Sequence, residues 1–310
     1  MKLETHYGKA AVSTYRTNAS PLTGVRTIPE SSFTGRPNIL LAASIDVQVM
    51  GDVFVRAYTH GDNSQVVATD TMKNFIHRES LAFQGSTLEG WLFFLGRRFL
   101  ETYPQMELLR VSGEEVRFDA QQVPGPGGSF APSETLYHRR HDDHGVAMLE
   151  LGRTADGSVE LTDLRSGRVG MELIKVTGSS FAAFARDDYT TLPERPDRML
   201  FTFVDISWRY ADPSIAVSPD PARYVDPQQV ADLAAVVFHG FVSLSIQHLV
   251  HEIGLRMLER YPELTEITFE AQNRTFDPAA QDESDEKRRV LTDPRPPYGR
   301  IGLTMYRDDQ

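Results

Sequence analysis

A duplicated segment is the feature of this chain that most narrows its fold. The sequence Gly96–Pro104 (GRRFLETYP) returns as Gly254–Pro262 (GLRMLERYP), and an identical shift pairs Phe118-Asp119 with Phe276-Asp277. Two unrelated helices that end in Tyr-Pro would share this register over two separate segments only by coincidence. The chain is therefore expected to contain two copies of one structural unit.

Each copy contains an amphipathic helix directly before its Tyr-Pro pair. Apolar residues recur at the i, i+3, i+4, i+7 spacing that places them on one helical face. They are Leu88, Trp91, Leu92, Leu95 and Phe99 in the first copy, and Ile246, Leu249, Val250, Ile253 and Met257 in the second. Ser86 and Glu89 have the spacing of a capping box, which predicts that the first of these helices begins at Ser86.

The segments around this helix follow the same order in both halves. Alternating or β-branched runs predict strands at 44–50, 108–118, 171–176, 200–210 and 266–269, whereas helical periodicity predicts helices at 71–83, 86–102, 227–238 and 245–260. Surface loops are expected at 18–37 and 123–128, where Pro, Gly, Ser and Thr gather. This order predicts an α+β fold, an antiparallel sheet with helices on one face, divided into units 1–152 and 153–310.

Composition limits the partners and the chemistry of the 310-residue chain. A formal charge of -11 and a pI near 5.3 argue against a nucleic-acid or membrane-surface partner, which would require a basic patch. The absence of cysteine excludes disulfides, thiolate nucleophiles and Cys-ligated metal sites. No apolar run of about 18 residues or charged-then-apolar leader is found, and Arg307–Gln310 is not a peroxisomal Ser-Lys-Leu signal. A cytoplasmic protein is expected.

Three consecutive polar residues end the apolar run Val66–Ala68 and open a helix. Thr69, Asp70 and Thr71 place a hydroxyl and backbone N–H groups at a helix N-terminus, where partial positive charge favours the binding of a planar anion. Thr and Asp also cap helices routinely, so the spacing alone indicates no more than an N-cap.

Three segments together resemble the urate oxidase (uricase) family: Tyr7-Gly8-Lys9, Val66–Asn74 and Phe181–Arg198. The last of these, FAAFARDDYTTLPERPDR, is the most specific match in the chain. Uricases have the tunnelling fold (T-fold), with two copies in each chain and four chains around a tunnel. The resemblance therefore implies a tandem duplicated T-fold and a homotetramer with active sites at subunit interfaces.

The resemblance assigns substrate recognition to the second half. Phe181 stacks under the purine, and Arg198 grips its edge through two parallel hydrogen bonds that lysine could not copy. Gln247 reads the purine edge beside the backbone N–H of Ile246, at the start of the second long helix. Without the family, Phe181 would be a core residue, Arg198 a surface ion pair and Gln247 an exposed polar residue.

The resemblance assigns proton transfer to residues of the first half. Lys9 approaches the hydroxyl of Thr69, and the two act as a relay that handles the urate proton and orients dioxygen or water. A lysine near apolar walls can have its pKa lowered enough for acid–base chemistry, although most such lysines are solvated. Asp70 is expected to bind substrate through its backbone N–H.

The segment Gln272–Phe276 also matches the family, with one departure from its pattern. Asn273 matches the asparagine that uricases place beside the oxygen site. Thr275 stands where the fungal and animal pattern has a relay histidine, and a threonine cannot take up a proton near neutral pH. Either a water chain through Thr275 replaces the histidine, or the pH dependence of the reaction differs. The sequence leaves both alternatives open.

The implied reaction converts urate, dioxygen and water to 5-hydroxyisourate and hydrogen peroxide without a metal or organic cofactor. Urate and dioxygen are then the small-molecule partners of the protein. Two alternatives stay open: a metal-dependent pterin- or GTP-processing enzyme of the same fold, and a catalytically dead purine-binding protein.

Two histidine clusters make the metal alternative worth testing. One holds His138, His141 and His144 in an arginine- and aspartate-rich run, and the other holds His248 and His251 beside Glu252. Neither has a zinc-enzyme spacing such as His-Glu-x-x-His, and the arginines would repel a cation. Both clusters are expected to be solvated loop or interface histidines.

Overall fold

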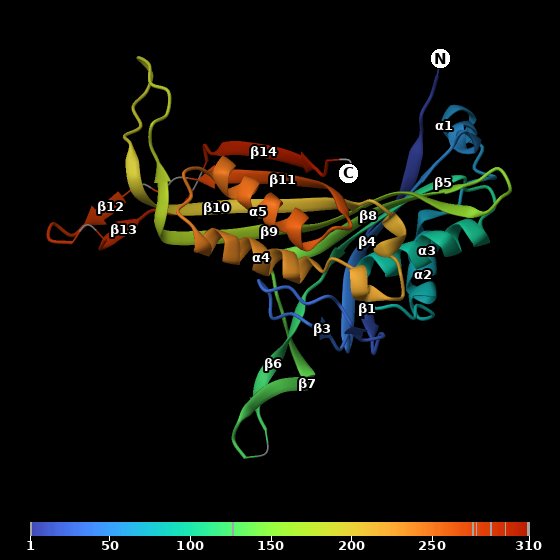
Figure 1. Cartoon of the computed structure of the whole chain (residues 1–310). Coiled ribbons are helices and arrows are strands. Elements are labelled where there is room, and N and C mark those ends of the chain that lie inside the picture. Colours follow the sequence, from blue (N-terminus) through green and yellow to red (C-terminus); the bar gives the residue numbers. More distant parts are fainter. Residues whose placement is uncertain are drawn as a thin grey trace.

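An eight-stranded antiparallel sheet forms the centre of the molecule in the computed structural model, which describes residues 2–125, 127–274, 276, 278–285, 287–294 and 296–308. Its strands are β1 (His6–Thr17), β4 (Leu40–Met50), β5 (Leu108–Glu115), β8 (His144–Arg153), β9 (Val159–Phe181), β10 (Arg195–Tyr210), β11 (Leu264–Arg274) and β14 (Gly299–Tyr306). They lie side by side in this order, so β1 and β14 are at the two ends of the sheet (Figure 1).

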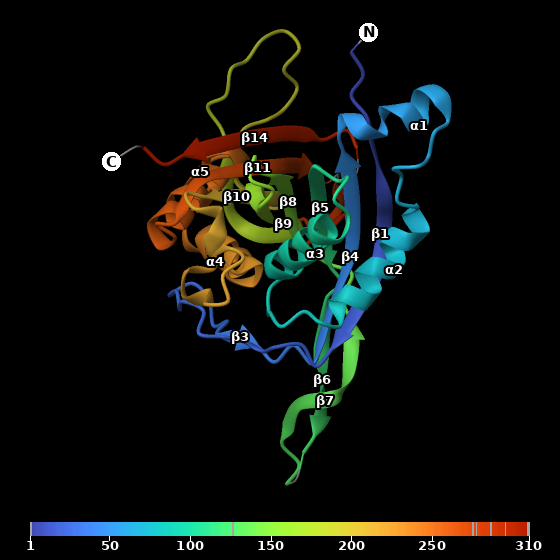
Figure 2. The ribbon, with the colours of Figure 1, turned by 90° about the vertical axis from the view of Figure 1, so that its right-hand side faces the viewer.

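Four helices cover one face of the sheet (Figure 2). They are α2 (Thr69–Ser80), α3 (Leu88–Thr102), α4 (Pro227–Gly240) and α5 (Ile246–Arg260). The helices α2 and α3 contact β1, β5 and β8, and α4 and α5 contact β9, β11 and β14; across the junction, α3 also contacts β9 and α4 also contacts β8. Alternate residues of β4, including Ile45 and Val47, are buried under this layer, and Asp46 between them is exposed on the opposite face. The predicted α+β fold is confirmed.

The two halves of the chain occupy the two halves of the sheet. Each half contributes two strands, a helix pair and two further strands, in the same order along the chain. The sheet continues across the junction because β8 pairs with β9, from His144 opposite Val169 to Arg153 opposite Val159. The division into units 1–152 and 153–310 stays a prediction; it falls at the end of β8.

The repeated helices α3 and α5 agree in length and in their caps. Each has 15 residues, and each is preceded by a hydroxyl side chain that satisfies a first-turn N–H. Thr87 Oγ1 accepts from the Gly90 N–H at 3.1 Å, and Ser245 Oγ accepts from the His248 N–H at 3.0 Å. All the apolar side chains predicted for the inner faces of these helices are buried.

The predicted capping box at Ser86 is wrong. The helix is capped by Thr87, and the Glu89 side chain turns into the protein instead of back to its own helix. Its carboxylate accepts from Ser166 Oγ at 2.6 Å and from Tyr224 Oη at 2.8 Å. Burial raises the pKa of Glu89 to about 7. Glu89 therefore joins α3 to β9 and to the segment before α4.

Several other boundaries differ from the prediction. The helix α2 begins at Thr69 rather than at 71 and ends at Ser80 rather than at 83, and Val66 and Val67 before it belong to no strand. The strand predicted at 108–118 ends at Glu115 because the chain then leaves the main sheet for a separate hairpin. The strands β9 and β10 extend well beyond 171–176 and 200–210, since polar residues continue their pairing.

The remaining elements lie outside the main sheet. They are β2 (Leu22–Thr23), β3 (Gly35–Arg36), β6 (Phe118–Pro124), β7 (Phe130–Arg139), β12 (Pro278–Gln281), β13 (Arg289–Leu291), α1 (Val55–His60) and the short 3₁₀ turns Asp52–Phe54, Pro213–Ile215 and Pro221–Arg223. The hairpin β6–β7 projects from the body (Figure 1) and includes the first two residues of the loop predicted at 123–128. The loop predicted at 18–37 is irregular apart from β2 and β3.

Ion pairs fasten this 18–37 loop of the first half to the second half. The Glu30 carboxylate binds the guanidinium groups of Arg256 at 2.7 Å and Arg260 at 2.9 Å, both on α5. These contacts, the Arg260 contact above all, hold the pKa of Glu30 at about 2. Arg26 binds Glu263 in the same region, at 3.0 Å. The loop thereby spans the two halves on the helix side.

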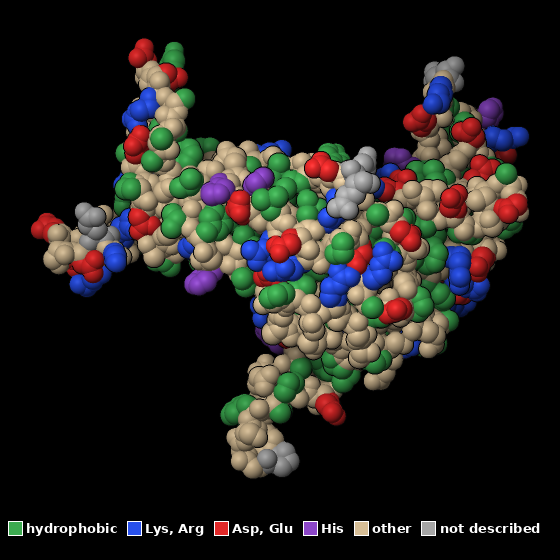
Figure 3. Space-filling view, in the orientation of Figure 1, with side chains coloured by type: hydrophobic (Ala, Val, Ile, Leu, Met, Phe, Trp, Pro, Cys, Tyr) green, Lys and Arg blue, Asp and Glu red, His purple; other side chains and the backbone are tan. Residues whose placement is uncertain are grey.

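Surface charge of both signs is interspersed over the helix-bearing face (Figure 3). No helix in the described part of the chain has the length and apolarity needed to cross a membrane.

Glu89→Gln is expected to flatten the pH dependence of stability. The folded-state pKa of Glu89 lies above its ordinary value of 4.5. The contribution of Glu89 to the free energy of unfolding is therefore complete below pH 4.5 and is lost as the pH rises through about 7. The pKa shift corresponds to about 3 kcal/mol of unfolding free energy. The glutamine side chain cannot ionise, so the variant would not lose this free energy as the pH rises. Denaturant unfolding at about pH 5 and about pH 8 measures the difference. Glu134→Gln, at an exposed site, is the control; equal pH dependence in both variants would contradict the assignment.

Candidate active site

The N-terminus of α2 presents free backbone donors. Thr69 is the first residue of the helix, and Ala68 before it offers no side-chain cap. The first intrahelical hydrogen bond runs from the Met72 N–H to the Ala68 carbonyl, so the earlier N–H groups have no helical partner. The Asp70 carboxylate is bound by Lys73 Nζ at 2.5 Å and Asn74 Nδ2 at 3.2 Å. Thr69 and Asp70 are therefore exposed at a helix end with the character of an anion site.

Lys9 lies beside this helix end on β1. The strand β1, which carries Lys9, packs against α2. Lys73 first, and Lys9 to a smaller degree, lower the pKa of Asp70. The Tyr7 hydroxyl accepts from the Val67 N–H at 3.1 Å and so ties β1 to the segment that leads into the helix. The structure thus brings Lys9, Thr69 and Asp70 to one region of the first half.

A β-bulge follows directly after Lys9. The register between β1 and β4 shifts between Lys9 and Val12, and Ala11 has a φ of 56°. The Ala11 N–H donates to Asp46 Oδ1 at 2.6 Å, so a carboxylate holds the bulge. Bulges of this kind re-aim neighbouring side chains and are frequent beside active sites.

Phe181 and Arg198 meet at the ends of β9 and β10. The Arg198 guanidinium carbon lies 5.3 Å from the centre of the Phe181 ring, and Phe184 stacks on the same ring at 5.0 Å. Burial lowers the pKa of Arg198, and its buried Nε has no hydrogen-bond partner among the described residues. A buried, unused N–H donor is unusual in a folded protein and indicates a ligand or water at this point.

The carboxylate of Asp197 fixes the backbone next to Arg198. It accepts from Thr177 Oγ1 at 2.6 Å and from the Gly178 N–H at 2.7 Å, across the β9–β10 pair. Gly178 has a φ of 81°, a conformation that favours glycine. These bonds set where the arginine leaves its strand.

Ile246 and Gln247 begin α5, directly after the cap Ser245. Ile246 is buried, whereas Gln247 is exposed. The segment before them is fixed to β9: the Ser180 N–H donates to the Ser243 carbonyl at 2.8 Å.

A buried hydroxyl pair strengthens the same connection. Ser243 Oγ donates to Ser179 Oγ at 3.0 Å, and both side chains are fully buried. Ser179 also lies opposite Arg198 in the β9–β10 pairing. The pair therefore links the strand that carries Phe181 to the helix that carries Gln247.

Asn273 lies on β11, opposite Thr202 of β10 and Gly299 of β14. Its neighbour Arg274 stacks on the Phe203 ring at 4.1 Å and the Tyr298 ring at 5.1 Å, which holds the end of the strand. Thr275 lies outside the described residues.

The candidate residues form two groups that one chain does not bring together. Lys9, Thr69 and Asp70 lie at the β1 end of the sheet, whereas the group of Phe181, Arg198, Ile246, Gln247 and Asn273 lies on β9, β10, β11 and α5 (Figure 1). Sequence reasoning missed the residues that position both groups, among them Asp46, Asp197, Ser179 and Ser243. No local signal would have found them, because their partners are distant in the sequence.

Neither histidine cluster gathers a set of metal ligands within the described residues. His138 and His141 are exposed, and His144 Nε2 lies 3.9 Å from Glu114 Oε2. In the second cluster, Glu252 Oε1 lies 3.7 Å from His248 Nε2 and 3.3 Å from His251 Nδ1.

Fold and candidate site together define a class: α+β proteins with two sheet-and-helix halves, each of which carries candidate binding residues at a helix N-terminus. The sequence model of the uricase family matches residues 5–147 and 164–302. A uricase of Haloferax volcanii is 48% identical over 98% of this chain and 98% of its own length. The uric acid degradation bifunctional protein PucL of Bacillus subtilis is 41% identical over 100% of this chain and 62% of its own.

Solved structures agree with this match. The crystal structure of Bacillus sp. TB-90 urate oxidase superposes with a TM-score of 0.94 at 41% identity, over 98% of this chain and 100% of that one. A uricase from Bacillus fastidious superposes with a TM-score of 0.94 at 40% identity, over 99% and 94% of the two chains. The chain belongs to the uricase family.

Ser243→Ala is expected to lower the free energy of unfolding by about 1–2 kcal/mol, because it leaves the Ser179 hydroxyl buried without its partner. The double variant Ser179→Ala/Ser243→Ala should lose less than the sum of the two single changes. Denaturant unfolding measures both quantities. The control is Ser13→Ala at an exposed position of β1. Strict additivity of the two serines would contradict the coupling.

Proposed function

We propose that this protein is a urate oxidase that converts urate, dioxygen and water to 5-hydroxyisourate and hydrogen peroxide in purine degradation. Membership of the uricase family supports this reaction. The structural observation that carries it is the half-buried Arg198, whose unpartnered Nε lies beside the Phe181 ring. A cation next to an aromatic face suits a planar, negatively charged ring.

Binding of the urate ring is assigned to the second half. Phe181 stacks on the ring, and Arg198 contacts its anionic edge with two parallel N–H donors. Gln247 and the Ile246 N–H, at the start of α5, read the remaining donors and acceptors. The Ser179–Ser243 link supports this division, because it fixes α5 relative to the strand that carries the stacking ring.

Lys9 and Thr69 carry the proton in this proposal, and the Asp70 N–H helps to hold the anion. Asn273 stands over the ring face, where dioxygen and then water react at C5. Deprotonated urate is electron-rich enough to pass electrons to dioxygen, so neither a metal nor an organic cofactor is required. The protein supplies orientation and fixed dipoles. Thr275 holds the sequence position of the family's relay histidine, so either a water chain replaces the imidazole or the pH dependence of the reaction differs.

The two groups meet only when a second copy of the chain supplies the missing half. We propose a homotetramer in the cytoplasm, with each active site between subunits. The strands β1 and β14 support this assembly, because each ends the sheet and can add a further strand. Pairing β14 of one chain with β1 of the next would repeat the β8–β9 junction found within the chain.

Chelator-treated protein is expected to consume urate, with loss of its ultraviolet absorbance and release of an equal amount of peroxide. The pterin- or GTP-processing alternative requires a metal and would lose activity after chelation. A purine-binding protein would bind urate without oxygen uptake. An oxygen electrode and a peroxide assay on one sample separate these outcomes, and absence of peroxide overturns the proposal.

Subunit mixing tests the shared site. Lys9→Met should keep most of the urate affinity and lose most of the rate, whereas Arg198→Ala should weaken binding first. After dissociation and reassembly of an equal mixture, about a quarter of the sites combine an intact Lys9 with an intact Arg198, so activity returns. Each variant treated alone is the control. A mixture no more active than its components would show that one chain supplies the whole site.

A further inference from the structure

Several residues of the candidate site have a counterpart in the other half of the chain. The bulge after Lys9 recurs in β9, where the register shifts and the Gly170 N–H donates to Asp205 Oδ1 at 2.7 Å, as the Ala11 N–H does to Asp46. Arg168 precedes Gly170 by two residues, as Lys9 precedes Ala11. Arg168 is therefore the counterpart of Lys9.

The helix beside the bulge repeats as well. Val67 and Val225 stand two residues before α2 and α4. Each donates its N–H to a tyrosine hydroxyl at 3.1 Å, although the two tyrosines, Tyr7 of β1 and Tyr210 of β10, are not counterparts. In α4 the first two residues are Pro227 and Gln228, which correspond to Thr69 and Asp70.

The recognition residues have counterparts in the first half. The matched helices place Glu89, the second residue of α3, in the position of Gln247 in α5. The shift that aligns these helices also aligns Glu115, at the end of β5, with Asn273 near the end of β11. Gln247 and Asn273, both proposed to contact substrate, thus have carboxylate side chains as their counterparts.

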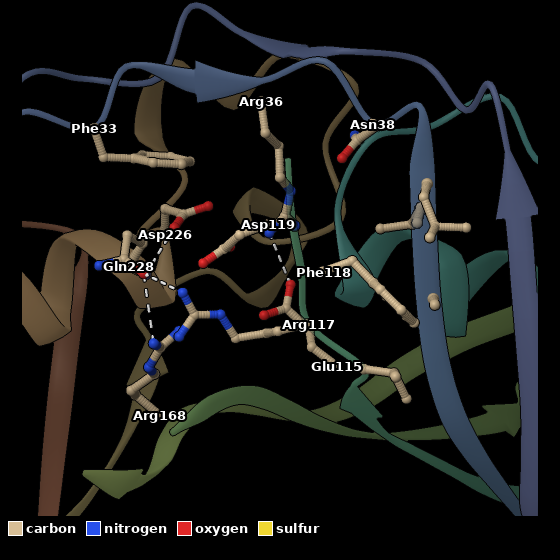
Figure 4. Close-up of a pocket in the computed structure, with 14 residues that line it drawn as sticks. Phe33, Arg36, Asn38, Glu115, Arg117, Phe118, Asp119, Arg168, Asp226 and Gln228 are labelled. Carbon is tan, nitrogen blue, oxygen red and sulfur yellow. Dashed lines mark hydrogen bonds and ion pairs between the residues drawn. The ribbon is translucent and has the colours of Figure 1, made fainter. Parts of the chain in front are cut away.

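These counterparts meet inside one chain. Arg168, Gln228 and Glu115 line a cavity of about 390 Å³ between the two halves, together with Phe33 and Arg36 of the loop at 18–37 (Figure 4). The β8–β9 pairing brings them together, just as a second chain is required for the proposed active site. Glu89, the counterpart of Gln247, already has a partner within the protein, because the Tyr224 hydroxyl donates to its carboxylate.

Buried polar atoms in this cavity have no partners in the described structure. Arg36 binds Glu115 through Nη1 at 2.9 Å, while its Nε and Nη2 stay unpaired. These two nitrogens form the side-on fork of a guanidinium, which matches a bidentate acceptor. Asn38 Oδ1 and Asp226 Oδ2 are also unpaired, on side chains that are only 3% and 1% exposed. A ligand that pairs with these atoms offers both an acceptor edge and N–H donors.

We propose that this cavity is a second, non-catalytic binding site for an oxopurine anion of the urate class. Such an anion carries carbonyl oxygens for the Arg36 fork and ring N–H groups for Asn38 and Asp226. The half-buried Phe33 ring supplies an apolar wall. The proposal rests on urate being the ligand of the active site.

The same correspondence explains why the cavity would bind without reaction. Pro227 stands in the place of Thr69 and has neither hydroxyl nor N–H to carry a proton. Glu115 replaces the asparagine proposed to stand over the ring, and Arg36 neutralises it. The relay and the oxygen site are therefore missing from this copy.

Equilibrium dialysis with urate under argon, where oxidation cannot proceed, counts the sites. The wild-type protein is expected to bind two urate molecules per chain. Arg36→Gln/Glu115→Gln, which removes the fork together with the carboxylate that it binds, should bind one and keep its oxidase activity. Arg78→Gln, at an exposed position of α2, is the control and should bind two.

The count separates failure of this inference from failure of the proposed function. One urate per wild-type chain, lost in Arg198→Ala, would overturn the second site and leave the proposed function intact. A count that Arg198→Ala does not lower would contradict the proposed active site instead. Wild-type stoichiometry alone decides the question if the double variant fails to fold.

Discussion

The hydrogen-bonded pairing of β8 with β9 is the interaction on which the rest of the architecture depends. It joins two copies of one unit into a continuous sheet, from the pair Arg153–Val159 to the pair His144–Val169. The strands lie in the sheet in the order in which they follow one another in the chain. This junction therefore determines which of the candidate residues and their counterparts meet within one chain and which stay apart. The Arg168 and Glu115 counterparts meet at the cavity, whereas Lys9 and Arg198 are left at separate places.

Buried polar contacts on the helix side reinforce that junction. Glu89 connects α3 to Ser166 of β9 and to Tyr224 of the second half, in a site where burial favours its protonated form. Glu30 connects the loop at 18–37 to α5 through Arg256 and Arg260. A carboxylate that loses such partners stays buried at a high free-energy cost, so these contacts specify how the halves pack.

The sequence predicted the plan of the fold better than its details. Periodicity and the internal repeat identified α3, α5 and the helix-covered sheet, because burial of an apolar face leaves a regular trace. Ser86 and Glu89 fit the capping box in spacing, yet Glu89 found stronger partners more than 70 residues away. The ends of β9 and β10 were missed since polar residues such as Thr177 continue the pairing there. The Arg36 fork could not be predicted, because its surroundings come from both halves.

The open ends of the sheet have a consequence for the life of the protein in a cell. An uncovered β1 is a template on which any extended chain can dock, and such edges promote aggregation. In the proposed tetramer a neighbouring chain covers this edge, so a newly made chain is exposed to the hazard until it assembles. Natural selection on solubility and natural selection on turnover would then act on the same surface.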